Sequence, residues 1–393
     1  MDAAEATTVA LIGVRGFGQK YMELLTSPAR AEHVRMVSGC DIAPDAAADL
    51  PPQVPFYTDF RAMLRECPAD VVIVATPPHQ HFEMARSALE AGSDVLMEKP
   101  PVVSSAEHTA LLDVCRSRHR VCQIGFQNLV GAPMQRLLQL TAEGRLGEIR
   151  DIAVTGAWIR RDSYYRRSRW AGHRTLDGVV VADGAATNPF AHAVMNALAI
   201  AEAADPGAVP VRMEVESYRC RDIATDDTIS ARLDLSGGQR IHIALTLCAE
   251  EFADPVVTVH GTGAVAELGA TATTLSVDGA PVELPADRGE PLDNLLAHLR
   301  EGSPLLVPLT RTAAFTSFVE SMVTSAPPHP VPADALEVHA DDDGQDRRVV
   351  LRGINDVIAE SGSEAKLFSE IGVPWAQPPE AIRLAQPTTV PRH

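Results

Sequence analysis

The sequence predicts an α/β chain, with a parallel sheet in an N-terminal domain and a mainly antiparallel sheet in an α+β second domain. The first observation is the alternation of short apolar runs with amphipathic stretches over about the first third of the chain, which is typical of parallel strands joined by helices. The second is a change, after about residue 127, to period-2 stretches separated by turn residues. The third is the length of 393 residues, which suits two domains and an additional tail.

Five apolar runs predict the buried strands of the first domain, and four amphipathic segments predict the helices between them. The strands are expected over residues 8–13, 34–41, 71–76, 95–98 and 121–126, and the helices over 17–25, 60–65, 80–91 and 106–117. Because such sheets bind ligands at the carboxyl ends of their strands, the residues directly after these runs are the candidate site. The first domain is predicted to span residues 1–127.

The second domain, expected over residues 128–330, combines helical segments with alternating strands. Helices are expected over 133–143, 188–204, 292–300 and 313–325, and strands over 149–159, 211–219, 228–235, 240–247, 256–260 and 265–268. The remainder, 331–393, is interpreted as a linker, a helix over 348–360 and a tail that packs back on the domains. The linker itself is the Pro- and Asp-rich segment 327–346.

Composition excludes several classes of function. A hydrophobic fraction of 46% indicates a globular protein, and a net charge of −18 argues against general binding to nucleic acids or anionic membranes. No apolar run approaches the ~18 residues that cross a bilayer, and the acidic first residues do not resemble a secretory signal. Six scattered cysteines without CxxC spacing are typical of reduced core thiols. We therefore expect a cytoplasmic protein with no metal site.

The turn after the first predicted strand is rich in glycine. Glycines let backbone N–H groups and a helix N-terminus approach a pyrophosphate, so this turn predicts a dinucleotide-binding site. A strict GxGxxG pattern would place glycine at position 15, where Arg15 stands, and Gly16 follows it. The candidate cofactor residues of this turn are Gly13, Arg15, Gly16, Phe17 and Gly18.

The second predicted strand ends at Asp41. A carboxylate there can accept hydrogen bonds from both ribose hydroxyls and would repel a 2′-phosphate, which favours NAD over NADP. A turn or helix cap is the structural alternative for Asp41. Arg15, near the same pocket, could weaken the preference.

Two further strand ends carry the sequences ATPPHQH at residues 75–81 and MEKP at 97–100, and GFQ follows at 125–127. Together with the glycine turn, these motifs resemble the Gfo/Idh/MocA family, which includes glucose–fructose oxidoreductase and inositol dehydrogenase. The resemblance implies an N-terminal Rossmann dinucleotide-binding domain, a C-terminal domain with a large open sheet, and sugar, inositol or other polyol substrates. It further implies cofactor contacts by Thr76, Pro77, His81, Glu98, Lys99 and Gln127.

Lys99 is the first candidate catalytic residue. A lysine at the end of a parallel strand and followed by Pro100 should lie in a cleft, where desolvation and a cationic nicotinamide ring would favour its neutral form. It could then exchange a proton with a substrate hydroxyl, with Glu98 holding it in place. His79 and His81 have no acidic or cysteine partner at ligand spacing, so they do not predict a metal site.

The segment 183–192 resembles the catalytic segment of the family, with His192 as the second candidate acid or base. Asn188 stands where many members have aspartate, four residues before the histidine. Followed by Pro189, Asn188 is also a good helix N-cap, so a structural role is an open alternative. The dipole of the following helix would keep His192 neutral and able to accept a hydroxyl proton.

Residues 158–170 form the other outlier, with five arginines against one aspartate and four interleaved aromatic residues. Aromatic faces can stack on the C–H surfaces of sugars, and arginine binds hydroxyl or carboxylate groups. A solvated loop or a subunit contact is the alternative. The candidate substrate-binding residues are Lys99, Trp158, Arg160, Tyr164, Tyr165, Trp170, Asn188 and His192.

We therefore predict an NAD-dependent oxidoreductase that acts on a secondary hydroxyl or keto group of a sugar, glycoside, inositol or related polyol. Lys99 and His192 exchange the hydroxyl proton. Two alternatives stay open, an NAD-retaining glycosidase that uses transient oxidation and a non-catalytic NAD-binding regulator. The antiparallel sheet needs cover on its second face, so a homodimer or homotetramer is expected.

Overall fold

The computed structural model describes residues 6–269, 273–285, 289–341 and 344–384. Contacts divide the chain into two compact units: Met1–Phe126 with Glu290–Ala313, and Gln127–Gly289 with Ala314–His393. The segment 290–313 therefore packs with the first unit, although it follows most of the second unit in the chain. No helix in the described ranges is long and apolar enough to cross a membrane.

The first unit is built on a six-stranded parallel sheet with the order β3-β2-β1-β4-β5-β6. This is the strand order of a Rossmann fold, and the five expected strands are confirmed. The strands are β1 (Thr7–Ile12), β2 (Val34–Cys40), β3 (Phe56–Tyr57), β4 (Val71–Val74), β5 (Asp94–Met97) and β6 (Cys122–Ile124). The helices are α1 (Gly18–Thr26), α2 (Phe60–Glu66), α3 (His81–Glu90), α4 (Ser105–Arg118) and α8 (Pro291–Glu301).

Part of the core of this unit comes from far along the chain. Leu292, Leu295 and Leu296 of α8 are buried in the same apolar cluster as Val9 and Leu11 of β1. Gln123 of β6 donates from Nε2 to the carbonyl oxygen of Pro291 (2.7 Å). The helix from the distant segment is thus an integral layer of the first unit.

The second unit is built on a ten-stranded mixed sheet. Its long central strand, β7 (Ile149–Ile159), pairs in parallel with β12 and antiparallel with β13. The sheet is antiparallel elsewhere, except where β17 pairs in parallel with β10. The other strands are β10 (Pro210–Arg219), β11 (Thr228–Leu235), β12 (Arg240–Thr246), β13 (Cys248–Gly261), β14 (Val265–Gly269), β15 (Leu275–Val277), β16 (Ala280–Pro281), β17 (His329–Pro330) and β20 (Glu380–Arg383).

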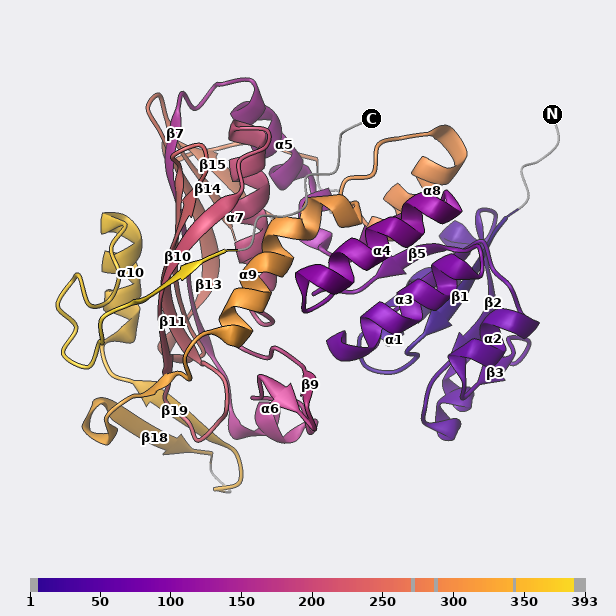
Figure 1. Ribbon diagram of the computed structural model, residues 1–393, viewed down its shortest axis with the longest axis horizontal. Helices are drawn as coiled ribbons and strands as arrows, with labels where there is room; N and C mark the ends of the chain where they lie inside the picture. The colour runs from indigo at the N-terminus through magenta and orange to yellow at the C-terminus, as the bar shows by residue number, and fades with distance from the viewer. Residues whose placement is uncertain (1–5, 270–272, 286–288, 342–343, 385–393) are drawn as a thin grey trace. The chain divides into compact units, whose positions relative to one another are not determined.

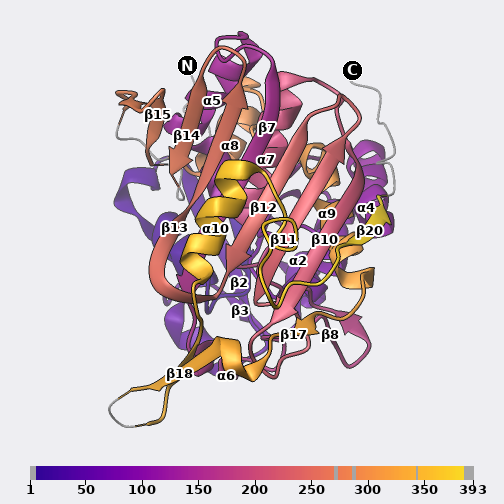
Figure 2. The same cartoon turned by 90° about the vertical axis from the view of Figure 1, so that its left-hand side faces the viewer.

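The two faces of this sheet carry different cover (Figure 1). Helices α5 (Ala132–Ala142), α7 (Ala191–Ala204) and α9 (Ala313–Thr324) lie on one face. On the other face, α10 (Ile354–Glu364) and the segment after it cross the strands, as Figure 2 shows. Tyr218 of β10 packs there against Phe368 and Trp375, with ring centroids 6.3 and 4.9 Å away. The C-terminal segment therefore buries part of the face that sequence analysis left open.

Two expectations for the C-terminal third were wrong. The segment interpreted as a linker contains β17 and the strand β18 (Leu336–Ala340), and β19 (Arg347–Leu351) begins directly after it. Residues 348–351, expected in a helix, belong to β19, and α10 begins only after Gly353, whose φ is +71°. The β-branched residues Val349 and Val350 pair with β18, and this tertiary pairing overrides the helical pattern.

Candidate cofactor and substrate sites

The glycine turn joins β1 to α1 as expected, and two of its glycines have no room for a side chain. Gly13 has φ +87°, and a Cβ there would lie 2.6 Å from the carbonyl oxygen of Ala75. A Cβ on Gly18 would overlap the carbonyl oxygen of Gly13. Gly16 has φ +64° but faces open space, and Phe17 is 47% exposed. The turn therefore forms a tight backbone cradle before a helix N-terminus, which fits a pyrophosphate.

Asp41 lies next to this cradle, at the end of β2. Its Oδ2 accepts hydrogen bonds from the backbone N–H groups of Val14 and Arg15 (3.0 and 3.3 Å), and its Oδ1 accepts one from Ala43 (3.1 Å). The carboxylate thus ties the glycine turn to the next strand. A cofactor ribose at this edge would meet a carboxylate that is already held in position.

Arg15 does not present a free cation at this edge. Its Nε and Nη1 donate to Asp49 and Asp45, each at 2.9 Å, and both aspartates lie on the short helix η2 (Pro44–Asp49). These bonds raise the pKa of Arg15. Arg15 is therefore engaged by two carboxylates, which would compete with a 2′-phosphate for the guanidinium group.

His81 links the two strand-end motifs of the first unit. Its Nε2 lies 2.7 Å from the carbonyl oxygen of Thr76, and its Nδ1 lies 2.8 Å from that of Pro100. The side chain is fully buried, and burial lowers its pKa. Because a neutral ring has one N–H, it donates to one of the two carbonyls at a time. His81 thus starts α3, as expected, and holds the segment around Thr76 and Pro77 against the segment around Lys99.

Glu98 is buried directly after β5. Its Oε1 accepts a hydrogen bond from the hydroxyl of Tyr21 on α1 (2.6 Å), and its Oε2 accepts one from the backbone N–H of Lys99 (3.2 Å). The expected role of Glu98 in placing Lys99 is therefore exerted on the lysine backbone. Lys99 is half-buried at the carboxyl end of the sheet. Gln127, the last cofactor candidate, is the first residue of the second unit, in η4 (Gln127–Val130).

In the second unit, the structure does not support the alternative role of Asn188 as the N-cap of the helix. Helix α7 begins at Ala191 with Phe190 as its N-cap residue. The Nδ2 of Asn188 donates instead to Oδ1 of Asp183 (2.6 Å), a buried carboxylate that also accepts from the Tyr164 hydroxyl (3.1 Å). A buried carboxylate needs hydrogen-bond donors, and the amide of Asn188 supplies one of them to Asp183. His192 lies in the first turn of α7, as expected.

Asp183 organises this part of the site. Its Oδ2 accepts a third hydrogen bond, from the backbone N–H of Gly172 (2.7 Å). Burial raises the pKa of Asp183, while its hydrogen bonds oppose the shift. One carboxyl group therefore holds together Gly172, Tyr164 and Asn188, which come from three different turns of the chain.

The arginine-rich stretch forms a stack of alternating rings and guanidinium groups. Arg160 lies 4.8 Å from the ring centroid of Trp158 and 4.9 Å from that of Tyr164. Arg167 lies 4.1 Å from the Tyr164 centroid and 4.9 Å from that of Trp170. The structure thus brings together four of the aromatic and cationic residues expected to bind substrate, and adds Arg167.

Trp158 connects the stack to α7, and Tyr165 packs against the middle of the stack. The Trp158 ring packs 4.5 Å from Phe190, two residues before His192, and is stacked on Phe252. The Tyr165 ring lies edge-on to that of Tyr164, with centroids 5.0 Å apart, and it also faces Arg221 (5.3 Å) and lines a hollow of about 360 Å³. The candidate aromatic residues for substrate binding therefore form one connected group.

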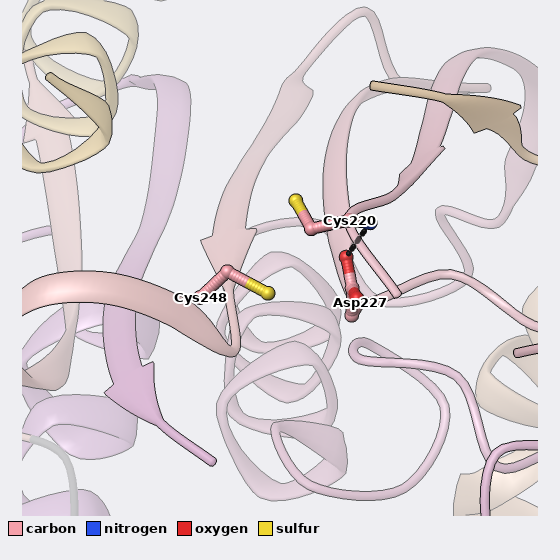
Figure 3. Close-up of side chains that lie close together, drawn as sticks. All are labelled: Cys220, Asp227 and Cys248. Atoms are coloured by element: carbon pink, nitrogen blue, oxygen red, sulfur yellow. Dashed lines mark hydrogen bonds between the residues drawn. The ribbon is translucent and has the colours of Figure 1, made fainter. Parts of the chain in front are cut away.

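A buried cluster of two thiols and a carboxylate lies beside Tyr165 at the ends of three strands. The donor atoms of Cys220, Asp227 and Cys248 all lie within 4.8 Å of one another (Figure 3). However, Arg221 Nη1 lies 2.8 Å from Cys248 Sγ, and both Asp227 oxygens accept backbone N–H groups (2.9 and 3.2 Å). A divalent cation would meet a guanidinium group here, so we assign the cluster a structural role.

Sequence analysis assigned no role to Asp183 or Arg167. Asp183 lies in the segment 183–192, and Arg167 is one of the five arginines of residues 158–170. A signal for Asp183 was present, since it is an isolated carboxylate in an otherwise apolar run. The rings that Arg167 contacts, Tyr164 and Trp170, lie three residues away on either side, so its spacing was a local signal. Arg166 instead contacts the distant Gln345.

Comparison with known proteins adds a family match. Residues 7–126 match the model of the oxidoreductase family with an NAD-binding Rossmann fold (GFO_IDH_MocA). The chain is 33% identical over 105 residues to D-glucoside 3-dehydrogenase of Escherichia coli, covering 27% of this chain and 29% of that protein. It is 30% identical over 122 residues to inositol 2-dehydrogenase 1 of Saccharopolyspora erythraea, covering 30% and 36%. The match thus spans about a third of each relative.

Solved structures match over a larger share of the chain. One is the WlbA dehydrogenase of Bordetella pertussis in complex with NADH and UDP-GlcNAcA, 21% identical, covering 81% of this chain and 95% of that one with a TM-score of 0.69. Another is an inositol dehydrogenase homologue of Azotobacter vinelandii with NADH and myo-inositol, 19% identical, covering 82% and 96% with a TM-score of 0.65. These likenesses show the two-domain fold. Residues 7–126 of the first unit match the NAD-binding Rossmann domain of the Gfo/Idh/MocA family of oxidoreductases.

Proposed function

We propose that the protein is an NAD-dependent dehydrogenase or reductase for a secondary hydroxyl or keto group of a sugar, glycoside, inositol or related polyol. The observation that carries the proposal is the combination, within one unit, of a glycine cradle after β1 and Lys99 after β5. Both lie at the carboxyl edge of one parallel sheet, where such folds bind dinucleotides. The relatives named as glucoside and inositol dehydrogenases support the substrate class.

The residues of the first unit hold the cofactor in this proposal. The backbone of residues 13–18 binds the pyrophosphate, and Asp41 accepts hydrogen bonds from the ribose of the adenosine half. Arg15 is engaged by Asp45 and Asp49, so the same edge disfavours the 2′-phosphate of NADP. The bound nicotinamide supplies a hydride acceptor or donor.

Lys99 and His192 exchange the proton of the reacting hydroxyl. The lysine emerges from a backbone that Glu98 and His81 hold from two sides, which fixes the start of its side chain. The histidine lies at the N-terminal end of α7, where the helix dipole favours a neutral ring that can accept a proton. Asn188, held by Asp183, is positioned to bind a substrate hydroxyl.

A screen of sugars and polyols with NAD, followed by NADH absorbance, tests the proposal. We expect stoichiometric NADH from at least one free sugar, glycoside or polyol. Release of an aglycone without net NADH would favour the glycosidase alternative. NAD binding without turnover on any member of the screen would favour the regulator and would contradict the proposal.

We also propose that the chain forms a homodimer or homotetramer through the sheet of the second unit. Helix α10 and the segment after it cover part of the outer face, so the contact uses the rest of that face. Light scattering should return a mass of two or four chains at micromolar concentration. A mass of 42.1 kDa, that of one chain, would rule the proposal out.

A further inference from the structure

The five arginines of residues 158–170 fall into two groups by their partners. Three of them are held by groups outside the stretch. Arg161 and Arg166 donate to the carbonyl oxygens of Asp346 and Gln345 (both 3.1 Å), and Arg169 pairs with Asp177 (3.2 Å). These three arginines therefore attach the stretch to the remainder of the second unit.

Arg160 and Arg167 are different. Within the described ranges, neither forms an ion pair with a carboxylate, and both guanidinium groups lie against the ring of Tyr164. Ring stacking leaves the in-plane N–H donors of a guanidinium group available for a planar anion. The chain thus keeps two cations against one tyrosine ring in a protein whose net charge is −18.

Asp183 compensates this charge only in part. Its two oxygens already accept hydrogen bonds from Tyr164, Asn188 and Gly172. Its attraction to Arg167 lowers its pKa, whereas burial raises it. One carboxyl group set against two guanidinium groups leaves an excess of positive charge.

Two buried donors next to this charge are also unsatisfied. Nε of Arg160 and Nε1 of Trp158 have no hydrogen-bond partner within the described part of the chain. A buried N–H without a partner is unfavourable, so such groups are usually retained for a ligand or water. Both belong to the group that packs, through Phe190, against the start of the helix that carries His192.

We infer that the substrate is an anionic sugar, whose carboxylate or phosphate group is bound by Arg160 and Arg167 while its ring packs beside Trp158. This inference rests on the proposed function, because it takes the same residues as the substrate site. It narrows the substrate from sugars and polyols in general to those that carry an oxyanion. Arginine binds both carboxylate and phosphate through paired hydrogen bonds, so the test must separate the two.

Tryptophan fluorescence gives a binding assay that does not depend on turnover, since Trp158 and Trp170 flank the two arginines. The NAD-loaded protein is titrated with D-glucose, D-glucuronate, D-gluconate and D-glucose 6-phosphate. We expect at least one anionic sugar to bind roughly 10- to 100-fold more tightly than glucose. Its affinity should fall as salt is added. Glucuronate and gluconate report a carboxylate site, and glucose 6-phosphate a phosphate site.

The variants Arg160→Met and Arg167→Met remove the charge and keep an apolar side chain of similar length. Each should remove most of the preference for the anionic sugar over glucose, measured as the ratio of the two dissociation constants. Arg169→Met is the matched control, because it removes the same charge from an exposed arginine paired with Asp177. Thermal unfolding of all three variants checks that the fold is intact.

Three results would overturn the inference: no anionic sugar binds more tightly than glucose, none binds at all, or Arg169→Met loses as much affinity as the other two variants. Its failure is distinguishable from that of the proposed function. Turnover of neutral polyols without any preference for anions would leave the function standing. Tight binding of an anionic sugar without NADH formation would instead support the anion-binding site and contradict the proposed dehydrogenase activity.

Discussion

The first unit presents its candidate groups from backbone at the ends of parallel strands, whereas the second unit holds its groups through contacts between side chains. Gly13, Asp41 and Lys99 each follow a strand of one sheet, so their places depend on strand order and local geometry. Tyr164 and Asn188 instead meet on the buried Asp183, through side-chain hydrogen bonds that depend on the folded chain. The comparison teaches that the first kind of site is encoded locally and the second kind by tertiary pairing.

The largest expected effect tests one catalytic group from each unit. Lys99→Ala and His192→Ala should each lower kcat by roughly 10²–10⁴-fold on a substrate found in the screen, because each removes a positioned acid or base. NAD binding should largely survive both changes. Lys366→Ala and His260→Ala, which alter the same residue types elsewhere, serve as controls. Near-normal turnover of His192→Ala would make that histidine structural and leave the chemistry to the first unit.

The second prediction separates strain from space in the backbone cradle. Gly13 and Gly16 both have positive φ, so alanine at either position costs about 1–2 kcal/mol of backbone strain. Only at Gly13 does a Cβ also meet a backbone oxygen, that of Ala75. Urea unfolding should show that Gly13→Ala lowers the free energy of unfolding by about 3 kcal/mol or more, clearly more than Gly16→Ala does. NAD titration should show the same order for the loss of NAD affinity. Equal losses for the two variants would mean that the close approach to Ala75 is unimportant.

A similar contrast explains how far the sequence predicts the structure. The five parallel strands and the residues at their ends were predictable, because buried strands give continuous apolar runs and glycine is required where backbone is crowded. The alternative of Asn188 as an N-cap was wrong because α7 begins only at Ala191, while the amide of Asn188 donates to the buried carboxyl of Asp183. The start of the last helix was wrong because Val349 and Val350 pair with a strand. In both cases the deciding feature, the burial of Asp183 or the pairing of β18 with β19, arises only in the folded chain.

The third prediction concerns the edge of the cradle that chooses between cofactors. NAD should bind more tightly than NADP by a few kcal/mol at most, and Asp41→Ala should narrow the gap. The double variant Asp45→Asn with Asp49→Asn releases Arg15 from its two partners. It should improve NADP binding and so further reduce the difference in affinity between NAD and NADP. Glu90→Gln, which disrupts an exposed ion pair on α3, is the control. Equal dissociation constants for NAD and NADP in the unmodified protein would contradict the assignment.

The smallest effect comes from a buried histidine in the sheet of the second unit. Burial lowers the pKa of His242 on β12 to about 4, against about 6.5 for an unfolded chain. Asp151 opposes this shift, while Arg232 and Arg240 add to it. Between these values the unfolded chain binds a proton that the folded chain does not, so stability falls as the pH falls from about 6.5 to 4. At pH 5 the loss is about 2 kcal/mol.

Thermal unfolding at pH 7 and pH 5 measures this loss. The drop in Tm should be several degrees smaller in His242→Gln than in the unmodified protein. His339→Gln, at an exposed histidine, should leave the drop unchanged. An identical drop in His242→Gln would show that other groups carry the acid sensitivity, such as His81 in the first unit, whose pKa is also lowered by burial.

The late return of α8 to the first unit has a consequence for the order in which the chain acquires its structure. During synthesis, the six strands of the cofactor sheet emerge first, but Leu292, Leu295 and Leu296 complete their core only after the strands β7 to β16 have been made. The nascent first unit therefore exposes an apolar surface until α8 has been made. The second unit is also incomplete at that stage, because α9 and α10 follow α8 in the chain. A ribosome that pauses before residue 290 would hold two incomplete cores at once, which makes this interval the point at which the protein most needs a chaperone.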